Sequence, residues 1–208
     1  MLLSSTTTSA RVCLVPEGAL LLADDEVELV VEVGPGAGLE LVEPGGTVAY
    51  DMRGGTARWD VDVTLGDHAR LVWGGEPFVL AAGADVRRHT RVRVGTGARL
   101  ALRETLVRGR HGEPGGRMVQ RLEVVDQDAS PLVVEELAVD PSTARGVLGL
   151  HRVVASVLAL GLDLPAEVLT EDRYDLEAGG TWWRRLGDEV HRTVAQDAWS
   201  TAREQVSR

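Results

Sequence analysis

The sequence contains no lysine, no asparagine and no isoleucine, so all 22 of its basic residues are arginine. The absence of lysine excludes a Walker A loop, in which a lysine contacts the nucleotide phosphates. It also excludes a Schiff-base enzyme of the pyridoxal or aldolase type. The three missing residues have AT-rich codons, and glycine, alanine, arginine, valine and leucine are abundant instead. This composition indicates a GC-rich bacterial genome.

Cysteine and long apolar runs are also scarce. Cys13 has no second cysteine with which to form an internal disulfide, which is typical of a reducing cytosol. Residues 1–11 lack a basic stretch followed by an apolar one, so we expect no secretory signal. The longest apolar run, residues 153–162, is too short to span a bilayer. We therefore expect a cytoplasmic protein without a membrane partner, with residues 1–208 in a single domain.

The negative charge is unevenly distributed. The formal net charge is −10, yet the segment from Arg53 to Arg121 holds thirteen arginines against seven acids. A basic segment between acidic flanks is either a partner surface or is neutralised by the flanks within one fold. Nucleic acid is not an expected partner, because the overall sign is negative and the basic segment offers only Trp59, Trp73 and Phe78 for base stacking.

Three segments of the sequence, residues 31–41, 63–73 and 92–102, align with one another. Each predicts a strand, a tight turn at a glycine and a second strand, because apolar residues alternate on both sides of the glycine. Four columns carry the alignment: Gly34, Gly66 and Gly95; Ala37, Ala69 and Ala98; Leu39, Leu71 and Leu100; and Leu41, Trp73 and Leu102.

A repeat of about thirty residues is typical of stacked units that cover one another's apolar faces. Alternating patterns continue to residue 139, and residues 173–186 predict a hairpin around a glycine pair. Residues 190–206 have helical spacing, and we expect this helix to close the core. The sequence therefore predicts an all-β fold of mostly antiparallel strands in stacked, solenoid-like sheets, with a short C-terminal helix.

Patterns that would indicate catalysis or a resident metal are missing from the sequence. There is no Gly-x-Ser-x-Gly nucleophile motif, the Gly-Gly pairs open no helix, and zinc-ligand spacings do not occur. These patterns give no support to an enzyme or to a tightly held cofactor. The five histidines are scattered along the chain: His68, His89, His111, His151 and His191.

One cluster of charged residues and glycines stands out between residues 103 and 117. It is interpreted in two ways: as a solvated hairpin loop between strands 100–107 and 117–125, or as a shaped loop whose arginines and glutamate pair with a partner protein or with each other. The candidate residues are Arg108, Gly109, Arg110, Gly112, Glu113 and Arg117.

This loop and two other runs resemble the urease accessory protein D family (UreD, also called UreH), in a short, GC-rich bacterial form. The runs are residues 46–51, 70–80 and 103–117, and residues 17–25 and 131–137 are similar to further segments of that family. The Gly-Arg-x-Gly-Glu element at residues 109–113 carries most of the specificity.

The resemblance implies a mostly β, non-enzymatic urease maturation factor. Members of that family bind the urease apoprotein, accessory protein F (UreF) and the GTPase accessory protein G (UreG). The complex delivers nickel to the carbamylated lysine site of urease, and a tunnel through the D subunit is a proposed metal route. We expect nickel in transit here, with transient contacts possible at His68, His89 and His111.

Two other functions remain open from the residues alone. A β-repeat module could bind a ligand such as a carbohydrate on aromatic platforms at Trp59, Trp73, Trp182 and Trp183, although two of these have core parity. An enzyme of the cupin type is a third possibility, but the cluster of histidines that would hold its metal is missing.

Overall fold

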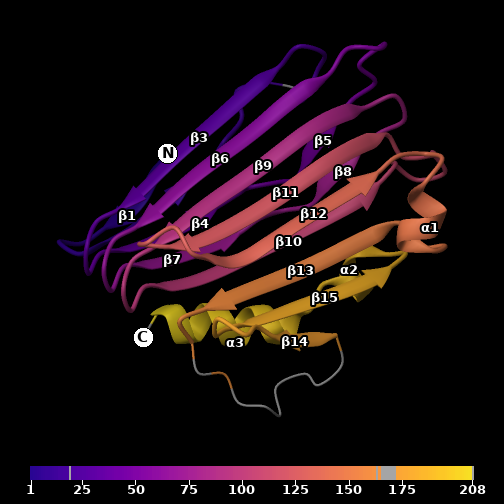
Figure 1. Cartoon of the computed structure of the whole chain (residues 1–208). Helices are drawn as coiled ribbons and strands as arrows, with labels where there is room; N and C mark the ends of the chain where they lie inside the picture. The colour runs from indigo at the N-terminus through magenta and orange to yellow at the C-terminus, as the bar shows by residue number, and fades with distance from the viewer. Residues whose placement is uncertain (19, 163, 165–171, 208) are drawn as a thin grey trace.

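The computed structural model describes residues 1–18, 20–162, 164 and 172–207, and shows two β-sheets packed face to face (Figure 1). The smaller sheet has the strand order β12-β11-β9-β6-β3, and the larger has the main order β1-β2-β4-β7-β10-β13-β15-β14 with β5 and β8 alongside. The strands of the smaller sheet are β3 (Glu26–Val33), β6 (Ala57–Leu65), β9 (Asp85–Val94), β11 (Arg117–Asp126) and β12 (Pro131–Val139). Those of the larger are β1 (Leu2–Ser5), β2 (Ser9–Cys13), β4 (Gly38–Val42), β5 (Thr47–Ala49), β7 (Arg70–Gly74), β8 (Phe78–Leu80), β10 (Arg99–Arg108), β13 (Val153–Leu160), β14 (Arg173–Asp175) and β15 (Thr181–Gly187).

The thirty-residue repeat is one coil of this solenoid. Each unit places a strand in the smaller sheet, turns, and continues as a strand in the larger sheet, as β3–β4, β6–β7 and β9–β10. Equivalent residues lie side by side, since Val31 pairs with Val63 and Val63 with Val92. The same holds for Leu39 and Leu71 in the larger sheet. The predicted repeat and the all-β, solenoid-like fold class are therefore confirmed.

The predicted strand direction is wrong for most of the molecule. Pairs between successive coils are parallel, and antiparallel pairs occur at β1–β2, β11–β12 and among β10, β13, β15 and β14. The reason is that the two strands of a repeat enter different sheets. Each strand then pairs with its equivalent in the next coil, which runs the same way. The hairpin of β14 and β15 is confirmed.

Stacking of the turns explains why Gly66 and Gly95 occupy the same position of successive repeats. A Cβ atom on Gly95 would lie 2.7 Å from the carbonyl carbon of Gly66, and one on Gly66 would lie 2.8 Å from the nitrogen of Pro35. A side chain therefore has no room where one turn lies on the next. The left-handed backbone of these turns is elsewhere, at Gly36, His68 and Gly97.

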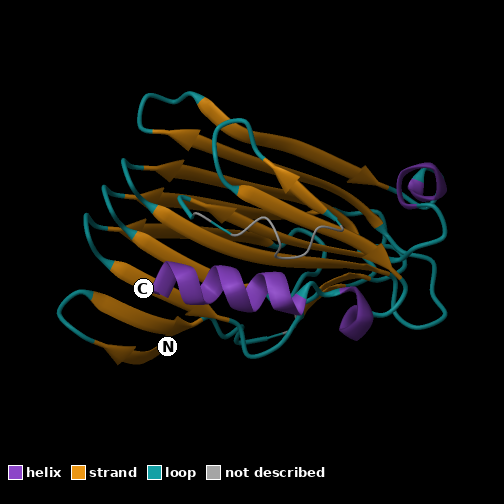
Figure 2. Ribbon diagram, turned by 90° about the horizontal axis from the view of Figure 1, so that it is seen from below, coloured by secondary structure: helices purple, strands orange, loops and turns teal. Residues whose placement is uncertain are grey.

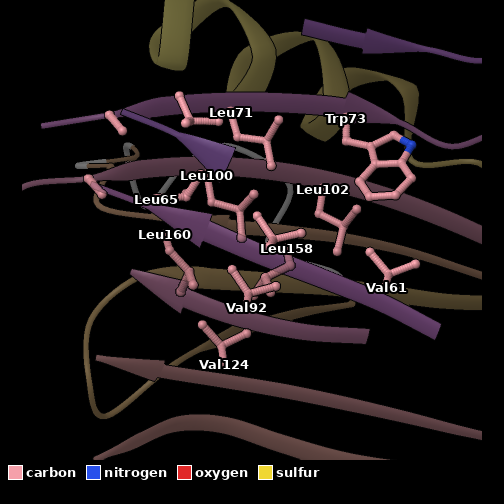
Figure 3. Close-up of a cluster of buried hydrophobic side chains, with 14 of the residues drawn as sticks. Val61, Leu65, Leu71, Trp73, Val92, Leu100, Leu102, Val124, Leu158 and Leu160 are labelled. Carbon is pink, nitrogen blue, oxygen red and sulfur yellow. The ribbon is translucent and has the colours of Figure 1, made fainter. Parts of the chain in front are cut away.

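Two apolar clusters fill the space between the sheets. The first gathers around residues such as Leu65, Leu71, Leu100 and Leu160 near the turns (Figure 3). The second lies toward the other end of the strands and includes Phe78, Leu80, Val86, Leu106 and Met118, with Leu148 of α1 (Ala144–Leu148) covering it.

The C-terminal helix lies on the outer face of the larger sheet (Figure 2). Ala198, Trp199, Ala202 and Val206 of α3 (Gln196–Ser207) are buried against β7, β10 and β13, where they form a third apolar cluster. The predicted amphipathic helix is therefore present, but it covers the outer face of this sheet and does not close the core between the sheets. The predicted continuous helix is interrupted, since α2 (Val190–Thr193) ends where the backbone of Val194 becomes extended. Two adjacent β-branched residues disfavour helix there. None of the described helices has the length and apolar character that crossing a bilayer requires.

Candidate functional site

Polar side chains separate the two apolar clusters. Arg88 on β9, Glu104 on β10 and Gln120 on β11 are each spaced by an even number of residues from core residues of the same strand, so all three point between the sheets. On the larger sheet the row of Glu104 continues through Ser156 to Arg184. We call this set the charged layer: Arg88, Glu104, Gln120, Glu135, Ser156 and Arg184.

The two sheets are joined by an ion pair in this layer. Arg88 Nη2 lies 2.7 Å from Glu104 Oε1, and the two side chains are only 15% and 12% exposed. Gln120 Nε2 donates to Glu104 Oε2 at 3.1 Å, and Arg88 Nη1 donates to Gln120 Oε1 at 3.4 Å. The Arg88 guanidinium also lies 5.5 Å from the ring centre of Phe78. Glu104 on the larger sheet is therefore bound by two residues of the smaller sheet.

Arg184 holds the other end of the charged layer. Its guanidinium pairs with Glu135 of β12, donates to Ser156 Oγ at 3.2 Å, and lies 4.5 Å from the ring centre of Trp182. Burial lowers the pKa of Arg184, and the nearby charge of Glu104 opposes that shift. The side chain keeps its positive charge at neutral pH, because an arginine pKa starts far above 7.

A second acidic group adjoins the layer where strands of the larger sheet are interrupted. Glu43 follows β4, and it accepts hydrogen bonds from Trp73 Nε1 at 2.8 Å and from the backbone N–H of Glu76 at 2.9 Å. Glu76 in turn pairs with Arg103 at 3.0 Å. The interruptions between β4 and β5 and between β7 and β8 thus bring two more carboxylates to the same level of the fold.

Three buried donors in or beside the charged layer have no hydrogen-bond partner among the described residues. These are Trp59 Nε1, Arg88 Nε and Trp182 Nε1. A cavity of about 20 Å³ is lined by Trp59, Arg88, Glu104 and Glu43, among others. That volume suits about one water molecule, which would satisfy buried donors of this kind. The interior is therefore polar and hydratable at this level.

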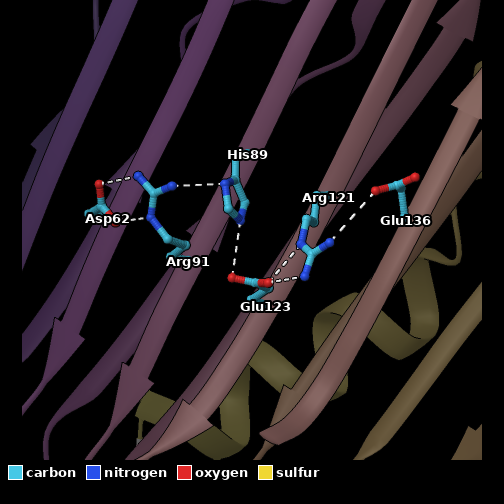
Figure 4. A network of polar contacts seen from close by, with 6 residues as sticks. All are labelled: Asp62, His89, Arg91, Arg121, Glu123 and Glu136. Atoms are coloured by element: carbon cyan, nitrogen blue, oxygen red, sulfur yellow. Dashed lines mark hydrogen bonds and ion pairs between the residues drawn. The ribbon is translucent and has the colours of Figure 1, made fainter. Parts of the chain in front are cut away.

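A separate network covers the face of the smaller sheet that is turned away from the core (Figure 4). Arg91 Nη2 lies 2.7 Å from Asp62 Oδ2, and Arg91 Nη1 lies 2.8 Å from His89 Nδ1. His89 Nε2 lies 3.2 Å from Glu123, which also pairs with Arg121. Since an arginine can only donate, His89 Nδ1 accepts, and the neutral imidazole therefore carries its hydrogen on Nε2.

This outer network lowers the pKa values of two of its carboxylates. The hydrogen bond from Arg121 holds the pKa of Glu123 below its usual value, and that from Arg91 does the same to the pKa of Asp62. Arg121 also reaches Glu136 on β12 at 3.8 Å. Four strands are thus connected by alternating charges, which favours the interpretation that much of the basic segment is neutralised within the fold.

The predicted loop residues lie together at the end of the sandwich opposite the stacked turns, but the loop is not a hairpin. It joins β10 in the larger sheet to β11 in the smaller, so it is an arc between sheets. Arg110 and Glu113 pair with each other at 2.7 Å, which holds the pKa of Glu113 below its usual value. Arg117 lies 3.5 Å from Asp85 on β9.

Two glycines and one arginine give this arc its shape. Gly109 and Gly112 have φ angles of 76° and 75°, the left-handed region in which glycine is favoured. The N–H of Gly109 donates to the carbonyl of Leu80 at 2.7 Å, which ties the arc to β8. Arg108 lies against Gly115, where a Cβ atom would lie 2.0 Å from Arg108 Cγ.

The three histidines expected to contact nickel lie far apart in the fold. His68 is in the turn between β6 and β7, whereas His111 is in the arc at the opposite end of the strands. His89 is on the outer face, with both ring nitrogens engaged. Among the described residues, no group of three His, Cys, Asp or Glu side chains is arranged to hold a metal ion.

Reasoning from the sequence missed the charged layer. A signal was present, because three successive predicted strands each carry one polar residue at a core-facing position: Arg88, Glu104 and Gln120. Such a position is expensive for a charged residue unless it is paired, so three in neighbouring strands predict an internal polar network.

The aromatic platforms proposed for a carbohydrate-binding module are not at the surface. Trp73 and Trp183 are 4% and 1% exposed. Trp59 and Trp182 pack against the first apolar cluster. The alternative of a ligand-binding module therefore loses the four rings on which it depended.

Comparison with known proteins gives consistent matches. Residues 3–207 match the family model described as UreD urease accessory protein. The chain is 48% identical over 183 residues to urease accessory protein UreD 1 of Streptomyces griseus, covering 86% of this chain and 71% of that protein. It is 36% identical to UreD 2 of Saccharopolyspora erythraea and 38% identical to UreD 3 of Streptomyces griseus, and spans 55% and 61% of their lengths.

Proposed function

The chain belongs to the UreD urease accessory protein family, and on that premise we propose that it acts in urease maturation as a non-catalytic scaffold in the cytoplasm. In this proposal it binds the urease apoprotein together with accessory protein F and the GTPase accessory protein G. Nickel is cargo that passes through the assembly and is not a cofactor held by this chain.

The charged layer is the observation that carries this proposal. Buried ion pairs seldom stabilise a fold more than apolar residues of similar volume would. A layer of this kind between two apolar clusters therefore supports a role other than stability. Glu104 and Glu135 in the layer, and Glu43 and Glu76 beside it, supply carboxylate oxygens, which are suitable ligands for a divalent cation.

The pairing of these carboxylates favours transit over storage. Glu104 is bound by Arg88 and Gln120, and Glu76 by Arg103, so an entering cation competes with donors that are already in place. This competition makes binding weak and reversible. The cavity of about 20 Å³ has room for about one water, whereas a hydrated divalent cation carries a shell of about six. We therefore propose that partner binding moves the arginine side chains aside before a hydrated ion passes.

The outer face and the glycine-rich arc are the proposed partner surfaces. The network from Asp62 to Glu136 spans four strands and presents a flat array of fixed charges. Such arrays steer association and fix the register of a complex more than they add to its affinity. Arg110 and Glu113 at the tip of the arc supply a further charged contact.

Co-expression with urease tests the proposed function. Urease structural genes and the F and G factors are expressed with and without this chain at limiting nickel, and urease activity is measured. We expect activity only when the chain is present, and full activity in its absence would contradict the proposal.

Equilibrium dialysis of the isolated protein tests the transit step separately, because tight stoichiometric nickel binding would exclude it. The genes that neighbour this one provide a further check, since urease genes beside it would support the assignment.

A further inference from the structure

The first coil of the solenoid is less covered than the coils that follow it. In the repeat column of Val31, the equivalent Val63 and Val92 are 3% and 2% exposed, whereas Val31 itself is only half-buried. Leu39 is likewise half-buried, whereas its equivalent Leu71 is 1% exposed. Equivalent positions of the repeat are therefore fully covered in the later coils and only half-covered in the first coil.

The topology shows where that neighbour is missing. β3 is the last strand of the smaller sheet, whereas the larger sheet continues past β4 with β2 and β1 (Figure 1). Among the described residues, no strand of the smaller sheet lies opposite β2. Of the twelve exposed large apolar residues in the described chain, six fall within residues 1–30: Met1, Leu2, Leu3, Val15, Leu22 and Val30.

Among the described residues, no main-chain group pairs with one edge of β3, which we call its free edge. The N–H of Arg58 donates to the carbonyl of Asp25 at 2.9 Å, and that of Gly66 donates to the carbonyl of Val33 at 2.8 Å. Since hydrogen-bonding direction alternates along a strand, the odd-numbered residues of β3 bond to β6. The even-numbered residues therefore direct their N–H and C=O groups away from the sheet: Glu26, Glu28, Val30 and Glu32.

The charge on this edge selects the kind of strand that fits. Glu26, Glu28 and Glu32 are on the outward face of β3, and Glu28 and Glu32 have no ion-pair partner among the described residues. A second copy of β3 would place glutamates opposite glutamates, which is destabilising. A strand with basic residues outward would place opposite charges side by side, as Arg91 and Asp62 do on the neighbouring strands.

We propose that the free edge of β3 is a docking site for a strand of a partner protein in which basic residues alternate with apolar ones. The partner strand adds to the smaller sheet opposite β2, by main-chain hydrogen bonds to residues 26, 28, 30 and 32. Its basic side chains lie beside the three glutamates, and its apolar side chains cover Val31, Leu29 and Val12, which are half-buried at present. The edge is eight residues long and contains no proline or glycine, so nothing in its backbone prevents pairing.

The test measures binding of a labelled peptide of alternating arginine and valine to the full chain by fluorescence anisotropy. We expect saturable binding that weakens as salt is raised. Val30→Pro removes one N–H from the free edge and leaves the β6 ladder intact, and proline is tolerated at such positions. We expect this variant to bind at least about tenfold more weakly. The matched control Val30→Ala removes the same side chain but keeps the N–H, and should bind like the wild type.

Two further experiments distinguish main-chain strand pairing from other forms of association. A triple variant, Glu26→Gln, Glu28→Gln and Glu32→Gln, should bind more weakly and with less dependence on salt. A fully N-methylated peptide of the same sequence should not bind, which provides the result even if Val30→Pro unfolds. Equal binding of a glutamate–valine peptide, equal binding by Val30→Pro, or dimerisation of the chain through this edge would overturn the proposal. None of these binding measurements involves urease, so their outcome is independent of whether the proposed function is correct.

Discussion

Arg88 and Glu104 connect the two sheets through the interior, with 2.7 Å between Arg88 Nη2 and Glu104 Oε1. Arg88 comes from β9 of the smaller sheet and Glu104 from β10 of the larger, and apolar clusters lie on both sides of them. A charge in such a place depends on the groups that it is paired with. The pair therefore gives the first prediction, because removing one member should destabilise the fold far more than removing the whole network.

Glu104→Leu leaves the guanidinium of Arg88 and the amide of Gln120 without their acceptor. We expect it to lower the free energy of unfolding by about 3–5 kcal/mol, as for other buried pairs that lose one partner. The triple variant Arg88→Met, Glu104→Leu, Gln120→Leu should unfold within about 1 kcal/mol of the wild type, because no buried polar group is orphaned. Urea denaturation measures both. A triple variant as unstable as the single one would show that the layer stabilises the fold.

The stacked turns provide the second prediction. Gly95→Ala places a Cβ atom 2.7 Å from the carbonyl carbon of Gly66, and the backbone must shift to accept it. We expect a loss of roughly 1–3 kcal/mol, as for other overpacked sites. Gly34→Ala, in the same column of the repeat, meets nothing within 4 Å. It should be neutral or slightly stabilising, because alanine reduces the freedom of the unfolded chain. Equal melting shifts for the two variants would contradict the stacking.

The outer network predicts a dependence of stability on pH. Glu123 and Asp62 have folded pKa values below their unfolded ones, so between those values the unfolded state binds more protons. Their contribution is therefore present above about pH 4 and is lost as the pH falls through the folded values. Glu123→Gln should flatten the decline in melting temperature on acidification while changing stability at pH 7 by less than about 1 kcal/mol. An unchanged acid profile would show that the pair does not form in solution.

The tip of the arc tests a partner contact. Arg110 and Glu113 are both at the surface and pair with each other, so Arg110→Glu or Glu113→Arg should leave the melting temperature nearly unchanged. We expect either reversal to weaken co-purification with the urease maturation proteins. The swapped double variant, Arg110→Glu with Glu113→Arg, restores the internal pair and serves as the control. Intact complexes with lower melting temperatures would show that the pair has a structural role only.

The repeat allowed the coil to be predicted because stacking repeats the same environment. Leu39, Leu71 and Leu100 occupy one row of the larger sheet, and a position that is repeated in space is repeated in the sequence. The direction of the strands could not be inferred in the same way. Alternation shows which face of a strand is buried, but a parallel and an antiparallel neighbour bury that face equally well. The interpretation of residues 109–116 as a hairpin loop is wrong for the same reason, because β10 and β11 lie in different sheets.

The charged layer depends on contacts between distant parts of the chain. Arg88 has core parity within its own strand, but its partners Glu104 and Gln120 come from two other strands, in part from the opposite sheet. Local patterns do not reveal such pairing. The arc residues, in contrast, are close in sequence, and they were identified because the pair of Arg110 and Glu113 is local.

The nickel content of urease tests the role of the charged layer most directly. Urease is co-expressed with the F and G factors and either the wild-type chain or the triple variant Arg88→Met, Glu104→Leu, Gln120→Leu, and nickel per purified active site is measured at limiting nickel. The matched control is Asp62→Asn with Arg91→Gln, which removes an ion pair from the outer face. The account predicts that the triple variant folds and joins the complex but leaves urease largely without nickel, whereas the control loads it normally. Full loading by the triple variant would contradict the account.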